Sequence, residues 1–131
     1  MSRLSWFASL TGIFVAALLA QSGEAQEKPG KLLRHIVMYK FKDTLQPAQV
    51  QEVVDAFNGL SKKIDAIVSL ESGTNVSMEG KSEGFTHVFV VTFRDEAGRA
   101  AYLKHPAHDA YVQVVKDKRD KVIVFDYWTQ P

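Results

Sequence analysis

The sequence predicts one α+β domain built on a four-stranded antiparallel sheet. Segments with strand and helix character follow one another in the order strand, helix, strand, strand, helix pair, strand. This order is typical of the split βαβ, ferredoxin-like arrangement, in which all helices lie on one face of the sheet. The most pronounced strand, residues 84–93, is β-branched or aromatic almost throughout and apolar on both sides. Both of its faces therefore need a cover.

The first 25 residues have the anatomy of a secretory signal peptide. Arg3 precedes an apolar run over residues 4–20, and a small-x-small cleavage site ends at Ala25. The run is short for a membrane span, which takes ~20 apolar residues, so cleavage is favoured over an uncleaved anchor. We expect an exported protein, periplasmic or secreted, that does not contact the membrane after cleavage. Residues 26–31 are predicted as a flexible leader and residues 32–128 as the folded domain.

Composition excludes several other classes of protein. The 131 residues include no cysteine, so the core and the assembly must stabilise the fold without disulfides. The formal net charge of +1 gives no reason to expect nucleic acid or an anionic membrane as partner. Neither a phosphate-binding glycine loop nor a Ser-His-Asp motif is recognisable, and we expect no cofactor.

The first half of the domain is predicted as strand, helix and strand. Residues 32–42 form the first strand, one side of which carries Leu33, His35, Val37, Tyr39 and Phe41. Pro47 suits the first turn of a helix that Asn58-Gly59 ends, with an apolar stripe of Val50, Val53, Val54, Phe57 and Leu60. Residues 67–76 are predicted as the second strand, and residues 79–84 as a polar turn bounded by glycines.

The second half is predicted as strand, two helices and strand. One side of the strand at residues 84–93 carries His87, Phe89, Val91 and Phe93. Asp95 is a good N-cap for a helix that runs to about Lys104. Pro106 then begins another helix, whose stripe is Ala107, Ala110, Tyr111, Val114 and Val115. After a solvated charge run over residues 116–121, residues 122–128 close the chain as a strand, with Val122, Val124 and Asp126 toward the helices.

The helix-free face of this sheet predicts a homodimer. Seven apolar side chains point there, and nothing else in the chain can cover them: Ile36, Met38, Val88, Val90, Ile123, Phe125 and Tyr127. Burying one such side chain is worth about 1.5–3 kcal/mol, so the seven together represent on the order of 10 kcal/mol. Face-to-face pairing of two sheets about a two-fold axis is the simplest cover. A slip of one residue in a strand's register is the alternative, since it exchanges the faces.

Histidines and a tyrosine are predicted to gather between helices and sheet. His35 and His87 lie near the starts of two strands that we expect to be parallel neighbours, so their side chains should be close. His108 lies in the first turn of the last helix, where the positive end of the dipole favours the neutral imidazole that a general base needs. Asp126 requires a partner if buried, and a histidine is the obvious one. Tyr102 lies one turn and a bend before His108 and can aim its hydroxyl into the same space.

Two interpretations of these residues remain open. They can form a catalytic or ligand-binding pocket, or they can simply satisfy hydrogen bonds in a filled core. A metal site is not expected, because His105 and His108 are three residues apart but no cysteine or carboxylate cluster adjoins them.

Four stretches of the chain resemble the stress-responsive A/B barrel domain, a family of the dimeric α+β barrel superfamily. They are RHIVMYKFKD at residues 34–43, EGFTHVFVV at 83–91, YLKHPAH at 102–108 and FDY at 125–127. The resemblance covers residues 32–128. It implies that two copies pair their sheets into a barrel.

The resemblance also implies roles for individual residues, because one plant member of the family cyclises a linear polyketide thioester. The matching positions here are His108 as base, Tyr102 as partner of the substrate carbonyl and Asp126 as the residue that orients the histidine. Two further pocket histidines are implied, His35 and His87. The apolar part of the pocket would be lined by Tyr39, Val53, Val54, Phe57 and Phe89.

The leading hypothesis is an exported homodimer whose helix–sheet pocket binds a small, partly apolar ligand. An enzyme of the polyketide cyclase or lyase type, using the His-Tyr-Asp set for acid–base chemistry, is the first alternative. A purely structural dimer with a filled pocket is the second.

Overall fold

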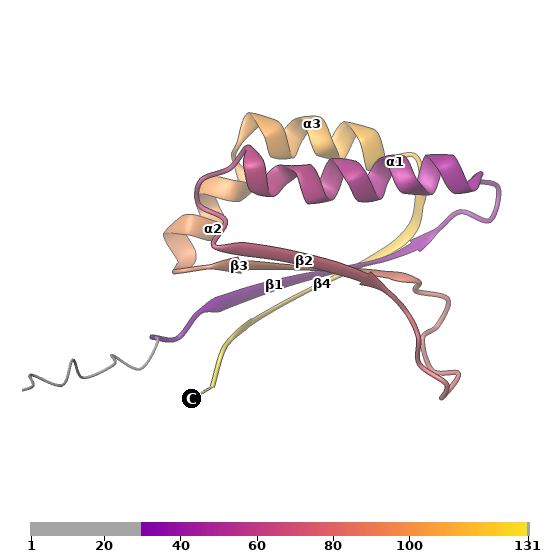
Figure 1. Ribbon diagram of the computed structural model, residues 1–131, viewed down its shortest axis with the longest axis horizontal. Helices are drawn as coiled ribbons and strands as arrows, with labels where there is room; N and C mark the ends of the chain where they lie inside the picture. Colours follow the sequence, from indigo (N-terminus) through magenta and orange to yellow (C-terminus); the bar gives the residue numbers. More distant parts are fainter. Residues whose placement is uncertain (1–29, 131) are drawn as a thin grey trace, which may run out of the picture.

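The computed structural model describes residues 30–130, and its secondary structure follows the predicted order. The predicted signal peptide at residues 1–25 lies outside the described residues. Two layers are visible in Figure 1, a twisted sheet and the helices that cover one of its faces. The elements are β1 (Leu33–Phe41), α1 (Pro47–Asn58), a 3-10 turn (Gly59–Lys62), β2 (Ser69–Thr74), β3 (His87–Phe93), α2 (Glu96–Leu103), α3 (Pro106–Val115) and β4 (Arg119–Trp128).

The sheet has the order β2-β3-β1-β4, and every neighbouring pair is antiparallel. His35 lies opposite Val91, whereas His87 lies opposite Tyr39. The two histidines are thus four residues apart in register, roughly 13 Å at ~3.3 Å per residue. The prediction that they are close was wrong. β1 and β2 run parallel to each other, and β3 lies between them and runs in the opposite direction. The starts of β1 and β3 therefore lie at opposite ends of the sheet.

The helix ends confirm the predicted capping chemistry. Pro47 begins α1 and Asn58 ends it. The Asp95 carboxylate caps α2 by accepting a hydrogen bond from the backbone N–H of Gly98 at 2.8 Å. The last helix begins at Pro106 as predicted.

Several details of the elements differ from the prediction. β3 begins at His87 and not at residue 84. β2 is shorter than residues 67–76, because only Ser69–Thr74 pair with β3. β4 begins at Arg119, inside the predicted charge run, because β1 is long enough to pair with that segment. Ala110, predicted in the apolar stripe of the last helix, is exposed.

The core lies between the helices and the side of the sheet that was predicted to face them. The largest side chains within it are less than 2 % exposed: Tyr102, Phe57, Phe89, Phe93, Leu33, Leu60, Ile64, Val53, Val91 and Val115. Along β1 every second residue is buried, from Leu33 to Phe41. This alternation confirms the predicted register of the central strands.

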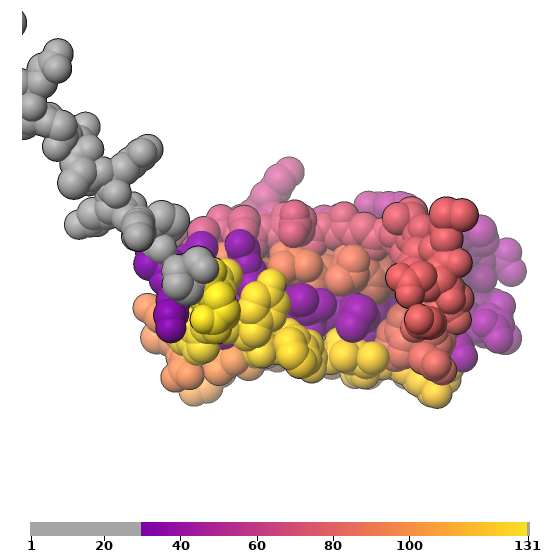
Figure 2. All heavy atoms as spheres, turned by 90° about the horizontal axis from the view of Figure 1, so that it is seen from below, coloured from indigo at the N-terminus to yellow at the C-terminus, as the bar shows by residue number. Residues whose placement is uncertain are grey.

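The opposite face of the sheet carries no helix. Figure 2 looks onto this face and shows β4, β1 and β3 lying side by side, with the loop between β2 and β3 over one end of them. Ile36 of β1 lies opposite Val90 on one side and Phe125 on the other, and Met38 lies opposite Val88 and Ile123. Ile123, Phe125 and Tyr127 are 39 %, 59 % and 41 % exposed. Within residues 30–130, each helix is too short or too polar to span a membrane.

Candidate functional site

A cavity of about 410 Å³ lies between the helical layer and the β1–β4 half of the sheet. Its apolar wall includes Val37, Phe57, Val122 and Val124, and its polar lining is His35, Tyr39, Arg99, Tyr102, His108, Tyr111, Arg119 and Asp126. Val124 is 55 % exposed although its side of β4 faces the helices. β4 is an edge strand that the helices do not fully cover, so the cavity is open along it.

Asp126 joins His35 to Arg99 at one end of this cavity. Each carboxylate oxygen has one partner: Oδ1 lies 2.7 Å from Nδ1 of His35, and Oδ2 lies 2.5 Å from Nη1 of Arg99. An ionised carboxylate can only accept hydrogen bonds, so the Nδ1–H of His35 donates to Asp126. His35 is only 6 % exposed, and Asp126 supplies the partner that a buried imidazole requires. The predicted histidine partner of Asp126 is therefore His35 and not His108.

His108 and Tyr102 lie together beside this pair. The rings of Tyr102 and His108 meet edge to face with centroids 4.6 Å apart, and the ring of His35 is 5.7 Å from that of Tyr102. Nδ1 of His108 is buried and has no hydrogen-bond partner among residues 30–130. Burial lowers the pKa of His108, and the positive charge that His35 can carry lowers it further, while Asp109 acts in the opposite direction. Burial also raises the pKa of Tyr102. At neutral pH the pair is a neutral imidazole and a protonated phenol.

A second polar group lies at the other end of β4. The hydroxyl of Tyr111 donates a hydrogen bond of 2.9 Å to that of Tyr39. Burial raises the pKa of both tyrosines. The Arg119 guanidinium, through its charge and a hydrogen bond to Tyr39, acts in the opposite direction on the pKa of Tyr39. This end of the cavity therefore combines a cation with two protonated phenols.

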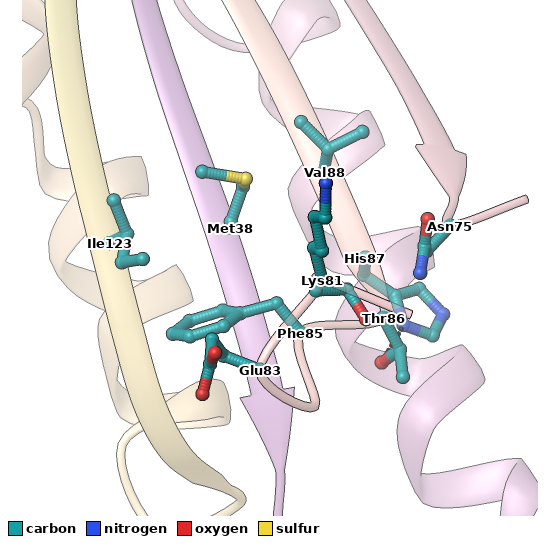
Figure 3. Close-up of a pocket in the computed structure, with 10 residues that line it drawn as sticks. Met38, Asn75, Lys81, Glu83, Phe85, Thr86, His87, Val88 and Ile123 are labelled. Atoms are coloured by element: carbon teal, nitrogen blue, oxygen red, sulfur yellow. Dashed lines mark hydrogen bonds between the residues drawn. The ribbon is translucent and has the colours of Figure 1, made fainter. Parts of the chain in front are cut away.

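His87 was implied to belong to the same pocket, but it lines a different cavity. That cavity, also about 410 Å³, lies on the helix-free face under the loop between β2 and β3. Figure 3 shows Phe85 and Glu83 of this loop beside Met38 and Ile123, with His87 at the far rim. Burial lowers the pKa of His87. The antiparallel pairing of β1 and β3 puts His87 at the opposite end of the sheet from His35, where its ring lies 5.1 Å from that of Phe41.

The implied apolar lining is divided between the cavity and the core. Tyr39 and Phe57 line the cavity. Val53 and Phe89 are fully buried, and Phe89 stacks on Phe57 with ring centroids 4.0 Å apart, so both belong to the core. Val54 packs against the edge of that core and is not among the lining residues.

Two arginines of the cavity were missed in the sequence. Arg99 precedes Tyr102 by three residues on α2 and so shares its face, a spacing from which it could have been found. Arg119 was hidden by a β-bulge, because the register of β4 shifts between the partners of Lys40 and Phe41. His105, by contrast, caps α3 by accepting a hydrogen bond of 3.0 Å from the N–H of Ala107. Within residues 30–130, no three His, Asp or Glu side chains are placed to hold a metal ion.

Comparison with known proteins places this geometry in a family. The model of the Stress responsive A/B Barrel Domain matches residues 33–129. The stress-response A/B barrel domain-containing protein HS1 of Arabidopsis thaliana is 32 % identical over 95 residues, which cover 72 % of this chain and 87 % of that protein. Olivetolic acid cyclase of Cannabis sativa is 33 % identical over 95 residues, which cover 72 % and 94 %. A dimeric ferredoxin-like protein of unknown function from Jannaschia sp. CCS1 is 27 % identical with a TM-score of 0.63, covering 73 % of this chain and 97 % of that chain.

Proposed function

Since this chain belongs to the stress responsive A/B barrel domain family, we propose that it is an exported homodimer whose helix–sheet cavity binds a small, partly apolar ligand. The observation that carries the proposal is the open cavity of about 410 Å³. Ligand sites are concave and mostly apolar, with a few convergent polar groups, and occupy about 300–1,000 Å³. This cavity fits that description, which favours ligand binding over a purely structural dimer.

Pairing through the helix-free face is the second part of the proposal. Ile123, Phe125 and Tyr127 are large side chains of β4 on this face. Phe125 is the most exposed of the three, at 59 %. An apolar patch of this kind marks an interaction surface. The Jannaschia relative with the same fold is described as dimeric, which supports the same assembly here. Export is proposed from the sequence of residues 1–25, which have the pattern of a cleaved signal peptide.

Fluorescence titration with a neutral apolar dye, N-phenyl-1-naphthylamine, tests the ligand-binding proposal. Val124→Trp places an indole at the open side of the cavity without enlarging the buried core. We expect dye binding to the wild type and at least a tenfold weaker affinity in V124W. Val76→Trp is the matched control, because Val76 is 87 % exposed on the β2–β3 loop and does not line the cavity. Equal affinities in the two variants, or no binding to the wild type, would refute the proposal.

An acid–base enzyme of the cyclase or lyase type is the second candidate function. The observation that favours it is Nδ1 of His108, which lies beside the ring of Tyr102 and has no hydrogen-bond partner in the described part of the chain. A neutral imidazole can abstract a proton next to a carbonyl group, and a protonated tyrosine can donate a hydrogen bond to the developing enolate oxygen. In this scheme Asp126 orients His35, which makes His35 a second candidate base. The resemblance to olivetolic acid cyclase supports the same reaction class.

Turnover of β-dicarbonyl test compounds separates the enzyme from a binding protein. We expect turnover to be lost in His108→Ala and retained in His105→Asn, because asparagine preserves the N-cap that His105 provides to α3. Activity that persists in H108A and disappears in His35→Ala would transfer the role of base to His35. No turnover by the wild type would leave ligand binding as the function.

A further inference from the structure

We propose that the ligands of this cavity are small apolar carboxylic acids, whose carboxylate is held by Arg119 and Tyr39. The inference rests on the proposed ligand-binding function and adds the chemical class of the ligand. It also assigns a direction to the bound molecule, with the acid group at the Arg119 end and the apolar body toward Asp126.

The bulge in β4 brings Arg119 into the cavity. Lys121 pairs with Lys40, but the next pair along is Arg119 with Phe41, so the bulge skips Asp120. If side chains simply alternated along β4, with Val122 and Val124 toward the helices, Arg119 would lie on the helix-free face. The bulge moves it to the side of Phe41, which is buried under the helices. Bulges are over-represented next to functional sites because they re-aim a side chain in this way.

Among residues 30–130, Arg119 has no carboxylate partner, unlike its neighbours Lys118 and Lys40. Lys118 is paired with Glu52 at 3.3 Å, and Lys40 is paired with Asp120 at 3.5 Å. Arg119 takes part in none of the salt bridges formed by residues 30–130. A half-buried guanidinium in an apolar cavity is most stable with an anion, and its planar fork matches a carboxylate.

The charges that line the cavity lead to the same conclusion. Arg99 and Arg119 contribute two positive charges, and Asp126 contributes one negative charge. Since Asp126 is bound to Arg99, the uncompensated charge lies at Arg119. One monoanionic ligand would neutralise the cavity.

Tyr39 supplies a second donor at this end. Its hydroxyl oxygen accepts the hydrogen bond from Tyr111, which leaves its own O–H proton available to a ligand oxygen. Tyr39 is only 2 % exposed, so its ring is held firmly in the core. A guanidinium and a fixed phenol together can bind both oxygens of a carboxylate.

The walls between the two polar ends suit an extended apolar body. Arg119 and Asp126 lie roughly 20 Å apart along β4 at ~3.3 Å per residue. Between them the lining includes Val37, Phe57, Val122 and Val124. A short alkyl chain or an alkyl-substituted ring can lie along these side chains with its acid group at Arg119.

Titration calorimetry with sodium octanoate and 1-octanol on the purified full-length protein tests the inference. The two probes share a chain length and differ in charge. We expect Arg119→Gln to weaken octanoate binding about tenfold or more and to change 1-octanol binding less than about twofold. Lys121→Gln is the matched control, because it removes the same charge from the same strand at a residue that does not line the cavity.

Each outcome has one meaning for the inference. A tenfold loss confined to octanoate and to R119Q supports it. Equal losses in R119Q and K121Q overturn it, because bulk charge would then explain the binding. Failure of the wild type to bind octanoate at millimolar concentration also overturns it. If N-phenyl-1-naphthylamine still binds in a manner sensitive to Val124→Trp, the proposed function survives; if neither ligand binds, both ideas fail.

Discussion

Asp126 shows how a single carboxylate organises one end of the cavity. Its two oxygens hold two different side chains, the imidazole of His35 and the guanidinium of Arg99. His35 and Asp126 are directly opposite each other on neighbouring strands. The sheet itself therefore sets the distance between them. The ion pair of Asp126 with Arg99 also links the sheet to α2.

Replacing Asp126 by asparagine should lower the free energy of unfolding by about 1–2 kcal/mol. The amide is isosteric but carries no charge, so both partners lose a charge-assisted hydrogen bond. Urea denaturation measures the change. Asp120→Asn on the same strand is the control, since its ion pair with Lys40 is long and exposed and contributes less than about 0.5 kcal/mol. Equal losses in the two variants would contradict the assigned role of Asp126.

His108 should make the protein less stable as the pH falls. Because its pKa is lower in the folded state than in the unfolded chain, the unfolded chain takes up the proton first. The free energy of unfolding should therefore decrease as the pH drops below about 6.5, the ordinary pKa of histidine. His108→Gln should reduce this decrease between pH 7.5 and 5.5 in urea titrations.

His87→Gln should be measured in parallel, because burial lowers the pKa of His87 as well. Each variant then reports its own contribution to the pH dependence. An H108Q protein with the pH dependence of the wild type would show that the pKa of His108 is the same in the folded and unfolded states.

At the residue scale, the sequence predicted the polar residues of the cavity more accurately than it predicted the contacts between them. Asp126 on the helix side of the last strand and His108 in the first turn of a helix both follow from local periodicity. The pairing of Asp126 with His35 depends on strand direction, which periodicity does not contain. Arg119 depends on a bulge, which shifts the alternation by one residue and leaves no local signal.

At the scale of elements, the β2–β3 connection is the part most dependent on glycine. Gly84 has φ +81°, and a Cβ there would lie 2.9 Å from Cε of Lys40. Gly84→Ala should cost about 1–2 kcal/mol of unfolding free energy, mostly from the left-handed backbone, since the lysine side chain can move. Gly73→Ala in β2 is the control, because nothing lies within 4 Å of its added Cβ. Similar stabilities of the two variants by urea denaturation would exclude backbone strain at Gly84.

Most elements were predictable because local chemistry marks their ends. Pro47, Asp95 and Pro106 begin or cap the three helices as expected. Strand ends were less predictable, because a strand extends as far as its neighbour pairs with it. β4 starts at Arg119 for this reason, with β1 as its template.

At the scale of the whole molecule, the helix-free face should control assembly. Phe125→Glu introduces a charge at the most exposed large side chain of that face. In a dimer this would bury two carboxylates, so we expect sedimentation velocity to show a dimer for the wild type and a monomer for F125E at micromolar concentration. Val68→Glu, at a 42 % exposed residue before β2, should remain dimeric. A stable, folded wild-type monomer would contradict the proposed pairing.

The edge position of β4 has a consequence for how two copies would respond to ligand. The cavity opens on the helix side of that strand, whereas pairing would use the opposite side. Each copy would keep its own entrance to solvent and share no lining residue with its twin. Occupancy of one copy would then leave the other unaffected, and saturation would follow a simple hyperbola with a Hill coefficient of about 1. Binding would then rise gradually with ligand concentration and would show no threshold.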